Sequence, residues 1–258
     1  MIVIIMAGGL GKRMESDLPK VLHHVICPSD TNISYPMIVH IIKTSVEFKI
    51  KKIFIIVGKY KNIIKNTIEE YIDSNIHLIE YVEQEPALGT AHAIKCALPT
   101  ISNYSNDRAL ILSGDVPLIS TNTLIGLDSE VNKLLITELM VPDGCGRILF
   151  DAEGKIIGIR EEKDCMGDEK KIKLVNCGIY QIRVIDLINL IPQIDNKNKS
   201  NEYYLTDIVG LMISNSIHIE TSILKNEYQY EIKNVNTKKD LDELNNYIKN
   251  NYDKYKSI

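Results

Sequence analysis

The sequence predicts an α/β protein with an open, mixed but mostly parallel sheet of Rossmann-like type. Short apolar runs rich in Ile and Val alternate with helix-length amphipathic stretches through the first half of the chain, which is the pattern of βαβ units. The runs are apolar throughout, as expected for strands that are buried on both faces. The second half instead shows strands separated by turns, typical of an α+β region. Because 45% of the 258 residues are hydrophobic, the chain can build a sizeable core.

The first half of the chain is predicted to contain four strand and helix units in succession. Each expected strand is a short run dominated by Ile, Val or Leu, and each expected helix is a longer amphipathic stretch. Strands are expected at 2–6, 53–57, 78–82 and 109–112, and helices at 37–48, 62–72, 90–98 and 121–131.

The second half of the chain is predicted to add further strands and two helices. Thr237 has the residue type of a helix N-cap, and apolar residues follow it at helical spacing, so the stretch 237–258 is expected to form an amphipathic terminal helix. Strands are expected at 134–141, 147–150, 155–160, 174–182 and 228–232, with a helix at 205–214.

The chain is predicted to form one continuous domain, 1–258, with two lobes. It contains neither a fixed-period repeat nor a linker rich in Pro, Gly or Ser. The change of pattern places the boundary between a first lobe at 1–133 and a second lobe at 134–258.

The composition argues against nucleic-acid and membrane partners. With 30 Lys and Arg against 34 Asp and Glu, the net charge is −4, and no basic stripe is present. The apolar runs, including the initial MIVIIM, are far shorter than the roughly 20 residues of a membrane span. The five cysteines lie far apart and form no CxxC pair, so we expect free thiols in a reducing compartment and a cytoplasmic protein.

A glycine-rich loop follows the first strand directly. The segment AGGLGKRM (7–14) lets backbone amides approach a polyanion, while Lys12 and Arg13 supply positive charge. Its spacing matches neither a Walker A loop nor a dinucleotide fingerprint. The loop alone therefore leaves two interpretations open, a phosphate site or a tight turn without a ligand.

Lys20 follows Pro19, which stiffens the chain after this loop. Such a lysine is by itself most often a solvated surface residue. The whole stretch MAGGLGKRMESDLPKVLHHV (6–25), however, resembles the signature of the sugar-nucleotide pyrophosphorylases, and specifically the uridylyltransferase half of bacterial N-acetylglucosamine-1-phosphate uridyltransferase. The resemblance implies a sugar nucleotidyltransferase fold, with a nucleotide-binding lobe at 1–133 and a sugar-binding lobe at 134–258.

Further matches recur in order along nearly the whole chain. EQEPALGTAHA (83–93) resembles the nucleoside segment of that family, and an amide side chain beside a glycine suits the hydrogen-bonding edge of uracil. Thr90 is also expected to be the N-cap of the following helix. By resemblance, the nucleotide-binding residues are Met6, Ala7, Gly8, Gly9, Lys20, Gln84, Gly89 and Thr90.

The segment LSGDVPLI (112–119) places Asp115 at the carboxyl end of a buried strand, where open α/β sheets bind ligands. Mg²⁺ needs only one or two protein oxygens, so a lone Asp is compatible with a magnesium site. The resemblance implies Asn236, in NVN (234–236), as the second ligand. Taken without the family, Asn236 is a residue that opens the following helix.

The sugar side is matched by GCGRI (144–148), GIREEKD (158–164), VNCGIY (175–180) and NEYYLTD (201–207). Tyr and Thr at a helix start are also often packing and capping residues, which leaves the last segment with two interpretations. By resemblance, the substrate-binding residues are Ser113, Gly114, Gly146, Glu161, Asn176, Tyr204 and Thr206.

The implied reaction joins UTP and N-acetylglucosamine-1-phosphate, with Mg²⁺ as cofactor and with Arg13 and Lys20 as catalytic charges. The attacking sugar phosphate is already anionic, because its second pKa is about 6, so no general base is required. His23, His24 and His92 lack metal-ligand spacing and are expected to have structural or surface roles.

Three departures from the family pattern concern Lys12, Ser113 and Cys177, which stand where Thr, Tyr and Thr are common. No hexapeptide repeat follows, so we expect neither acetyl transfer nor the trimer that the β-helix of the bacterial enzyme forms. Two rivals stay open, a uridylyltransferase for N-acetylgalactosamine-1-phosphate or glucose-1-phosphate and an inert nucleotide-binding module.

Overall fold

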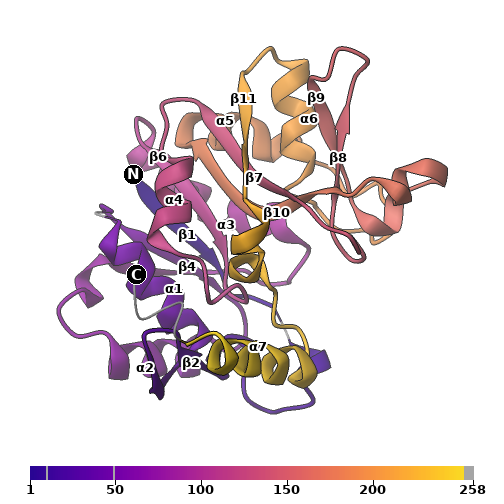
Figure 1. The fold of residues 1–258 in the computed structure, drawn as a ribbon. Coiled ribbons are helices and arrows are strands. Elements are labelled where there is room, and N and C mark those ends of the chain that lie inside the picture. Colours follow the sequence, from indigo (N-terminus) through magenta and orange to yellow (C-terminus); the bar gives the residue numbers. More distant parts are fainter. Residues whose placement is uncertain (10, 49, 253–258) are drawn as a thin grey trace.

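The structure is a computed structural model that describes residues 1–9, 11–48 and 50–252, without the side chain of Lys12. Within these residues a nine-stranded sheet forms the centre of the molecule (Figure 1). Its strands are β1 (Ile2–Met6), β4 (Ile53–Val57), β5 (Ile79–Glu83), β6 (Arg108–Ser113), β7 (Asn132–Glu138), β8 (Arg147–Phe150), β9 (Ile156–Arg160), β10 (Leu174–Arg183) and β11 (Ile219–Ile223).

The sheet is open and mixed, in the order β11-β7-β10-β6-β1-β4-β5. Strands β6, β1, β4 and β5 run parallel, and β11 runs parallel to β7. Strand β10 runs antiparallel to both β6 and β7, and it joins the two halves of the chain in one sheet. This architecture confirms the predicted α/β class, with a parallel first half and a mixed second half.

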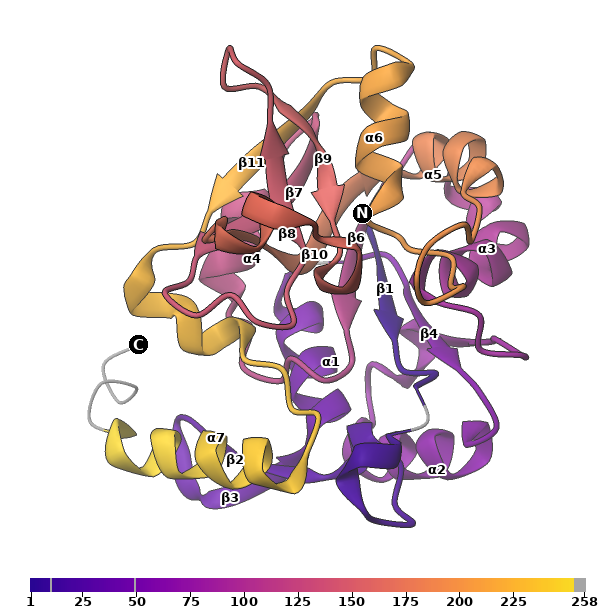
Figure 2. The same cartoon turned by 90° about the vertical axis from the view of Figure 1, so that its right-hand side faces the viewer.

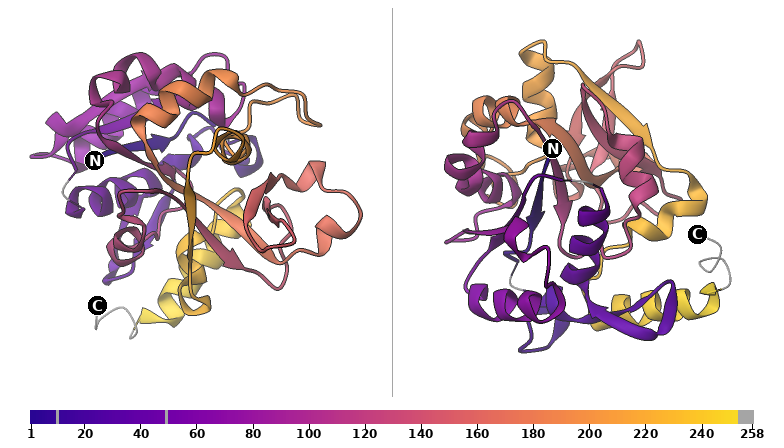
Figure 3. Two further views of the ribbon diagram at one scale, coloured as in Figure 1. Left: turned by 90° about the horizontal axis from the view of Figure 1, so that it is seen from above. Right: turned by 90° about the vertical axis from the view of Figure 1, so that its left-hand side faces the viewer.

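Helices cover both faces of the sheet (Figures 1 and 3). Alternate side chains of β1 point to opposite faces, so Ile2 and Ile4 join one apolar cluster while Val3 and Ile5 join the other. The first cluster packs against α3, α5 and α6, and the second against α1, α2 and α4. The helices are α1 (Met37–Glu47), α2 (Lys61–Tyr71), α3 (Thr90–Ile101), α4 (Thr121–Leu127), α5 (Val184–Leu190), α6 (Asp207–Ser214) and α7 (Lys238–Asn250).

The terminal helix α7 packs against segments of the first half of the chain. It packs beside a two-stranded hairpin of β2 (His24–Cys27) and β3 (Asp30–Pro36), as Figure 2 shows. Leu244 and Ile248 of α7 share a third apolar cluster with Val25 and Met37. This packing brings residues before α7 next to the glycine-rich loop. The predicted division into lobes stays a prediction.

The structure departs from the sequence-based expectation at several elements. The predicted strand at 228–232 is wrong, because these residues lie in a 3-10 helix, η8 (Asn226–Ile232). Its buried Glu231 accepts hydrogen bonds from the backbone and hydroxyl of Ser120, which fixes this segment as a turn of helix. The hairpin β2–β3, strand β11 and helix α5 were not predicted. The terminal helix ends at Asn250, and residues 253–258 of its predicted range lie outside the described part of the chain.

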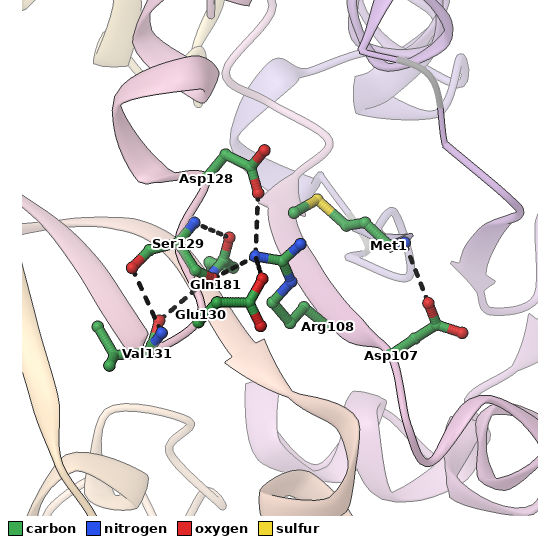
Figure 4. Close-up of polar contacts among 8 residues, drawn as sticks. All are labelled: Met1, Asp107, Arg108, Asp128, Ser129, Glu130, Val131 and Gln181. Atoms are coloured by element: carbon green, nitrogen blue, oxygen red, sulfur yellow. Dashed lines mark hydrogen bonds and ion pairs between the residues drawn. The ribbon is translucent and has the colours of Figure 1, made fainter.

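The helix predicted at 121–131 ends at Leu127, and the next residues form a loop that is held by hydrogen bonds and ion pairs (Figure 4). Arg108 at the start of β6 forms ion pairs of 3.2 Å with Asp128 and with Glu130, and it donates to the carbonyl of Ser129. The amide of Gln181 donates to the carbonyl of Ser129 at 2.7 Å. These contacts provide partners for polar groups of the loop that would otherwise need hydrogen bonds within a longer helix.

In the described part of the chain, no helix is both long enough and apolar enough to cross a membrane.

Candidate active site

The residues predicted to bind the nucleotide gather where the parallel strands end. Met6 ends β1, Ser113 ends β6 and Gln84 follows β5 directly. The amide of Gly114 donates to the carbonyl of Met6 at 2.9 Å, and a Cβ on Gly114 would lie 2.9 Å from that same oxygen. Only glycine therefore lets the two strand ends approach this closely, at the edge where open α/β sheets bind ligands.

A cavity of about 270 Å³ opens at these strand ends. It is lined by all eight residues predicted to bind the nucleotide and also by Ser113 and Asp115. A larger cavity of about 740 Å³ lies between α1, α4 and the segment 222–231, and no predicted site residue lines it. Sequence reasoning missed four lining residues of the smaller cavity, namely Val21, Ala87, Ala93 and Glu202. Glu202 belongs to the NEYYLTD segment (201–207), so that motif could have pointed to Glu202 as a residue near the site.

Gln84 is held rigidly at the wall of this cavity. It is only 6% exposed, and its side-chain nitrogen donates to the carbonyl of Gly89 at 2.9 Å. A Cβ on Gly8 would lie 2.9 Å from Oε1 of Gln84, so the glycine-rich loop and the amide are in close contact. His92 lies behind Gln84, with its Nδ1 3.4 Å from the amide nitrogen. Burial lowers the pKa of His92, which favours its neutral form.

The turn at Gly89 and Thr90 is tied to the second half of the chain. Gly89 has a φ of 116°, and a Cβ there would lie 2.5 Å from the carbonyl oxygen of Tyr203. The predicted N-cap role of Thr90 is wrong, because Gly89 is the N-cap and Thr90 is the first helical residue. The hydroxyl of Thr90 instead accepts a hydrogen bond from the backbone of Leu205 at 2.9 Å.

A polar cluster lies beside the cavity and contains both predicted catalytic residues and both predicted metal ligands. Nζ of Lys20 lies 2.5 Å from Oδ2 of Asp115 and donates to Oδ1 of Asn236 at 3.1 Å. Arg13 donates to the same Oδ1 of Asn236 at 3.1 Å. Ser113 donates to the other carboxylate oxygen of Asp115 at 2.6 Å. Residues from both ends of the chain therefore converge on one point.

Asn236 is positioned by the start of α7. The carboxylate of Asp240 accepts hydrogen bonds from the backbone amides of Asn236 at 2.9 Å and Thr237 at 2.8 Å. In return, the hydroxyl of Thr237 accepts from the amide of Asp240 at 3.1 Å, which completes a capping box. The backbone of Val235 also donates to the carbonyl of Asp115 at 2.9 Å, so both candidate ligands share one support.

The donor set of this cluster suits a hard divalent cation. Asp115 is 8% exposed, and its carboxylate and the amide oxygen of Asn236 both face the ammonium of Lys20, which marks a position for positive charge. Among the described residues, no group of three or more His, Cys, Asp or Glu is arranged so that it could hold a metal ion. Two oxygen ligands match Mg²⁺, which keeps its remaining positions for water and phosphate oxygens.

Among the residues predicted to bind the sugar, Glu161 and Thr206 contact each other directly. The hydroxyl of Thr206 donates to Oε1 of Glu161 at 2.8 Å. Burial, reinforced by the charges of Asp207 and Asp164, raises the pKa of Glu161 against the lowering effect of this hydrogen bond. Burial, together with the charges of Asp164 and Glu161, likewise raises the pKa of Tyr204. A partly desolvated carboxyl group of this kind suits hydrogen bonds with hydroxyl groups of a ligand.

Asn176 is fixed at an irregularity of β10. Its side-chain nitrogen donates to the hydroxyl of Tyr180 at 2.6 Å, and its side-chain oxygen accepts from the amide of Gly178 at 3.0 Å. Its backbone amide donates to the carbonyl of Gly146 at 2.9 Å. A Cβ on Gly146 would lie 3.7 Å from the carboxyl carbon of Glu161. Gly146, Glu161 and Asn176 are therefore close neighbours, although none of them lines the 270 Å³ cavity.

The departures from the family pattern have local explanations at two of the three positions. Ser113 supports Asp115 through the hydrogen bond described above. Cys177 is buried in the apolar core, and burial raises the pKa of its thiol, so it packs as a small neutral side chain. The third position, Lys12, differs in its side chain, and that side chain lies outside the described part of the structure.

Comparison with known proteins decides the family. The model of the nucleotidyl transferase family matches residues 2–228 of this chain. A probable UDP-N-acetylglucosamine pyrophosphorylase of Acanthamoeba polyphaga mimivirus is 41% identical over 96% of either chain. This chain belongs to the nucleotidyl transferase family. It is a sugar-1-phosphate nucleotidyltransferase, in agreement with the family that the sequence motifs resemble.

Bacterial relatives of this nucleotidyl transferase are longer. The bifunctional protein GlmU of Aromatoleum aromaticum is 35% identical over 94% of this chain, and that of Legionella pneumophila is 35% identical over the same share. The chain spans about half the length of these bacterial relatives, 50% and 51% respectively. A solved structure of a provisionally named glucose-1-phosphate thymidylyltransferase of Bacillus anthracis, with sucrose, has a TM-score of 0.67 at 21% identity, covering 96% of this chain and 95% of that one. This likeness shows the shared fold.

Proposed function

We propose that this nucleotidyl transferase moves UMP from UTP to N-acetylglucosamine-1-phosphate and so forms UDP-N-acetylglucosamine and pyrophosphate. The observation that carries the proposal is the convergence of Arg13, Lys20, Asp115 and Asn236 beside a cavity lined by the glycine-rich loop. Positive charges and candidate metal ligands at one point are what transfer between phosphates requires.

The chemistry needs positioning rather than proton transfer. A sugar phosphate is already anionic near neutral pH, since its second pKa is about 6, so its oxygen attacks the α-phosphate of UTP without a general base. Pyrophosphate leaves on the opposite side of that phosphorus. Arg13 and Lys20 would offset the charge that develops on the α-phosphate and on the leaving group. Lys20 lines the cavity, and its ammonium has three N–H donors, of which the contacts with Asp115 and Asn236 use two.

Asp115 and Asn236 would hold the magnesium ion. When bound, Mg²⁺ neutralises phosphate charge and helps to orient the reacting groups. Ser113 holds one oxygen of Asp115 by its hydrogen bond, and Asp240 holds the backbone of Asn236, so both ligands are oriented by the protein itself.

The nucleotide would occupy the 270 Å³ cavity, with Gln84 and the turn at Gly89 facing the uracil. Uracil offers alternating acceptors and a donor, which an amide side chain and backbone groups can match. Gln84 is buried and bonded to Gly89, so its orientation is fixed before binding, which lowers the entropic cost of recognition. Gly146, Glu161, Asn176, Tyr204 and Thr206 would face the acetamido sugar.

The presence of Arg13, Lys20 and Asp115 in one cluster favours an enzyme over the inert binding module. The sugar is supported by the resemblance of the Glu161 and Asn176 segments and by the name of the mimivirus relative.

The test is release of pyrophosphate from UTP and Mg²⁺ by the purified protein, with N-acetylglucosamine-1-phosphate, N-acetylgalactosamine-1-phosphate or glucose-1-phosphate as the acceptor. We expect fast release with the first sugar phosphate, none with EDTA and almost none in Asp115→Ala. Asp128→Asn is the matched control, because Asp128 forms an ion pair at the opposite end of β6. Release without added metal, or full activity of Asp115→Ala, would contradict the proposed metal site, and no release with any sugar phosphate would favour the inert module.

A further inference from the structure

Arg147 is a buried cation to which the proposed chemistry gives no role. Its side chain is 1% exposed, yet Nη2 lies 2.5 Å from Oε2 of Glu162, which is 33% exposed. Nη1 donates to the backbone carbonyl of Cys145, and Nε is buried with no hydrogen-bond partner among the described residues. Burying a guanidinium with one nitrogen unsatisfied is costly, so the contacts it does make call for an explanation.

The two partners of Arg147 come from separate segments, and each lies next to a residue proposed to contact the sugar. Cys145 precedes Gly146, and Glu162 follows Glu161. These two segments are in close approach, because a Cβ on Gly146 would lie only 2.9 Å from Cγ2 of Ile159. The guanidinium therefore bridges the segment that contains Gly146 and the segment that contains Glu161.

Arg147 also marks the attachment of the β8–β9 hairpin to the main sheet. Among the described residues, the ladder between β8 and β10 consists of the single pair of Arg147 and Val175. The hairpin and the segment after it extend away from the rest of the sheet (Figures 1 and 3). Beyond this pair, the amide of Asn176 donates to the carbonyl of Gly146. Because this ladder is short, the side chain of Arg147 helps to hold the hairpin beside β10, together with the packing of β9 against α6 and of Ile148 and Ile159 in the apolar core.

We propose that Arg147 is a positioning residue for sugar recognition, one that fixes Gly146 and Glu161 relative to Asn176 through its two-sided contact with Cys145 and Glu162. The inference rests on the proposed function of these three residues as sugar contacts. A guanidinium can hold a carbonyl and a carboxylate at once through its fixed planar geometry, which a lysine ammonium does not reproduce. The role is separate from that of Arg13, which faces the candidate metal ligand Asn236.

The test compares Arg147→Met and Glu162→Gln with Arg108→Met as the matched control. Arg108 likewise bridges a loop carbonyl and carboxylates, but at the far end of β6 (Figure 4). We expect the KM for N-acetylglucosamine-1-phosphate to rise about 10-fold or more in both test variants, since small misplacements of binding groups are costly. The KM for UTP should stay within about twofold of that of the wild-type protein, because Arg147 does not line the nucleotide cavity.

Hydrogen exchange supplies a second measurement that does not depend on turnover. The amides of Asn176 and Cys165 donate to the carbonyls of Gly146 and Glu161, so both should exchange faster in Arg147→Met and stay protected in Arg108→Met. If Arg147→Met does not fold, Glu162→Gln carries the test, because it keeps the shape of the side chain.

An unchanged sugar-phosphate KM in folded Arg147→Met or Glu162→Gln would overturn the positioning role. So would equal rises in the KM for the sugar phosphate and for UTP. Failure of the proposed function has a different signature, because the wild-type protein itself would then form no UDP-sugar, while the exchange of Asn176 and Cys165 would still report on Arg147.

Discussion

Replacing Lys20 by Met is expected to tighten divalent-cation binding to the nucleotide-free protein while it lowers turnover. The ammonium of Lys20 lies 2.5 Å from Oδ2 of Asp115 and 3.1 Å from Oδ1 of Asn236, the two oxygens proposed to hold the metal. The ammonium and the metal ion therefore compete for the same ligands. Turnover should fall because the same ammonium is proposed to meet the phosphates of UTP.

The burial of the ion pair between Lys20 and Asp115 determines how strongly the ammonium competes with a metal ion. Exposed ion pairs contribute about 0.2 to 1 kcal/mol, while close charge pairs at buried interfaces couple by about 1.5 to 7 kcal/mol. The side chains of Lys20 and Asp115 are 15% and 10% exposed, so some screening by water remains. A value of about 2 kcal/mol lies between the two classes and corresponds to about 30-fold tighter cation binding.

The assay is a titration of nucleotide-free protein with Mn²⁺, in which electron paramagnetic resonance measures the free ion. Lys51→Met is the matched control, because Lys51 forms a 2.8 Å ion pair with Asp107 at the other end of the sheet. We expect tighter Mn²⁺ binding in Lys20→Met only. Equal or weaker binding in Lys20→Met would refute the idea that Lys20 holds the position of the metal.

Three further predictions concern the supports of the site. Gly89→Ala should weaken UTP binding about 10-fold or more and lower the melting temperature, because its φ of 116° and a Cβ 2.5 Å from the oxygen of Tyr203 force the turn to shift; unchanged calorimetric binding would contradict this. Burial raises the pKa of Glu161 in the folded protein, so ionisation opposes folding once the pH exceeds the usual carboxyl range. Glu161→Gln should therefore raise the melting temperature at about pH 8 and do so less at about pH 4, where the carboxyl group is mostly protonated in both states; an equal gain at both pH values would count against this cause. Asp240→Ala should weaken Mn²⁺ binding and cost about 1 kcal/mol of stability, because it removes the acceptor that holds the amide of Asn236; stability lost without any change in Mn²⁺ affinity would rule out the positioning effect.

The strands, and the gathering of glycine-rich loop residues around the 270 Å³ cavity, were predictable because their signals are local. Strands such as β1 and β4 are continuous apolar runs, and burial on both faces of the sheet makes that pattern unambiguous. The glycine-rich loop and Asp115 each follow a strand directly, so the direction of the strands was enough to bring them to one edge.

Elements with weak local signals were missed. Strand β11 has the sequence IETSI, and as an edge strand it keeps two side chains exposed, so it lacks a clear apolar pattern. The segment YQYEI has the composition of a strand but forms η8, because contacts of Glu231 with Ser120 override that preference.

Contacts between distant segments were the other limit of sequence reasoning. The hydrogen bond between Thr90 and Leu205 and the bridge made by Arg147 depend on the packing of the second half of the chain. No local rule of spacing encodes them. Thr90 illustrates the point, since its residue type fits a helix cap while the fold uses its hydroxyl to hold another segment.

The central claim is the choice of the sugar phosphate, and one competition measurement tests it most directly. The wild-type protein is incubated with UTP, Mg²⁺ and equal amounts of N-acetylglucosamine-1-phosphate, N-acetylgalactosamine-1-phosphate and glucose-1-phosphate, and mass spectrometry quantifies the UDP-sugars, with the isomeric products separated by chromatography. The account predicts that UDP-N-acetylglucosamine dominates and that EDTA abolishes every product. Dominant UDP-glucose or UDP-N-acetylgalactosamine, or the absence of all three, would contradict it.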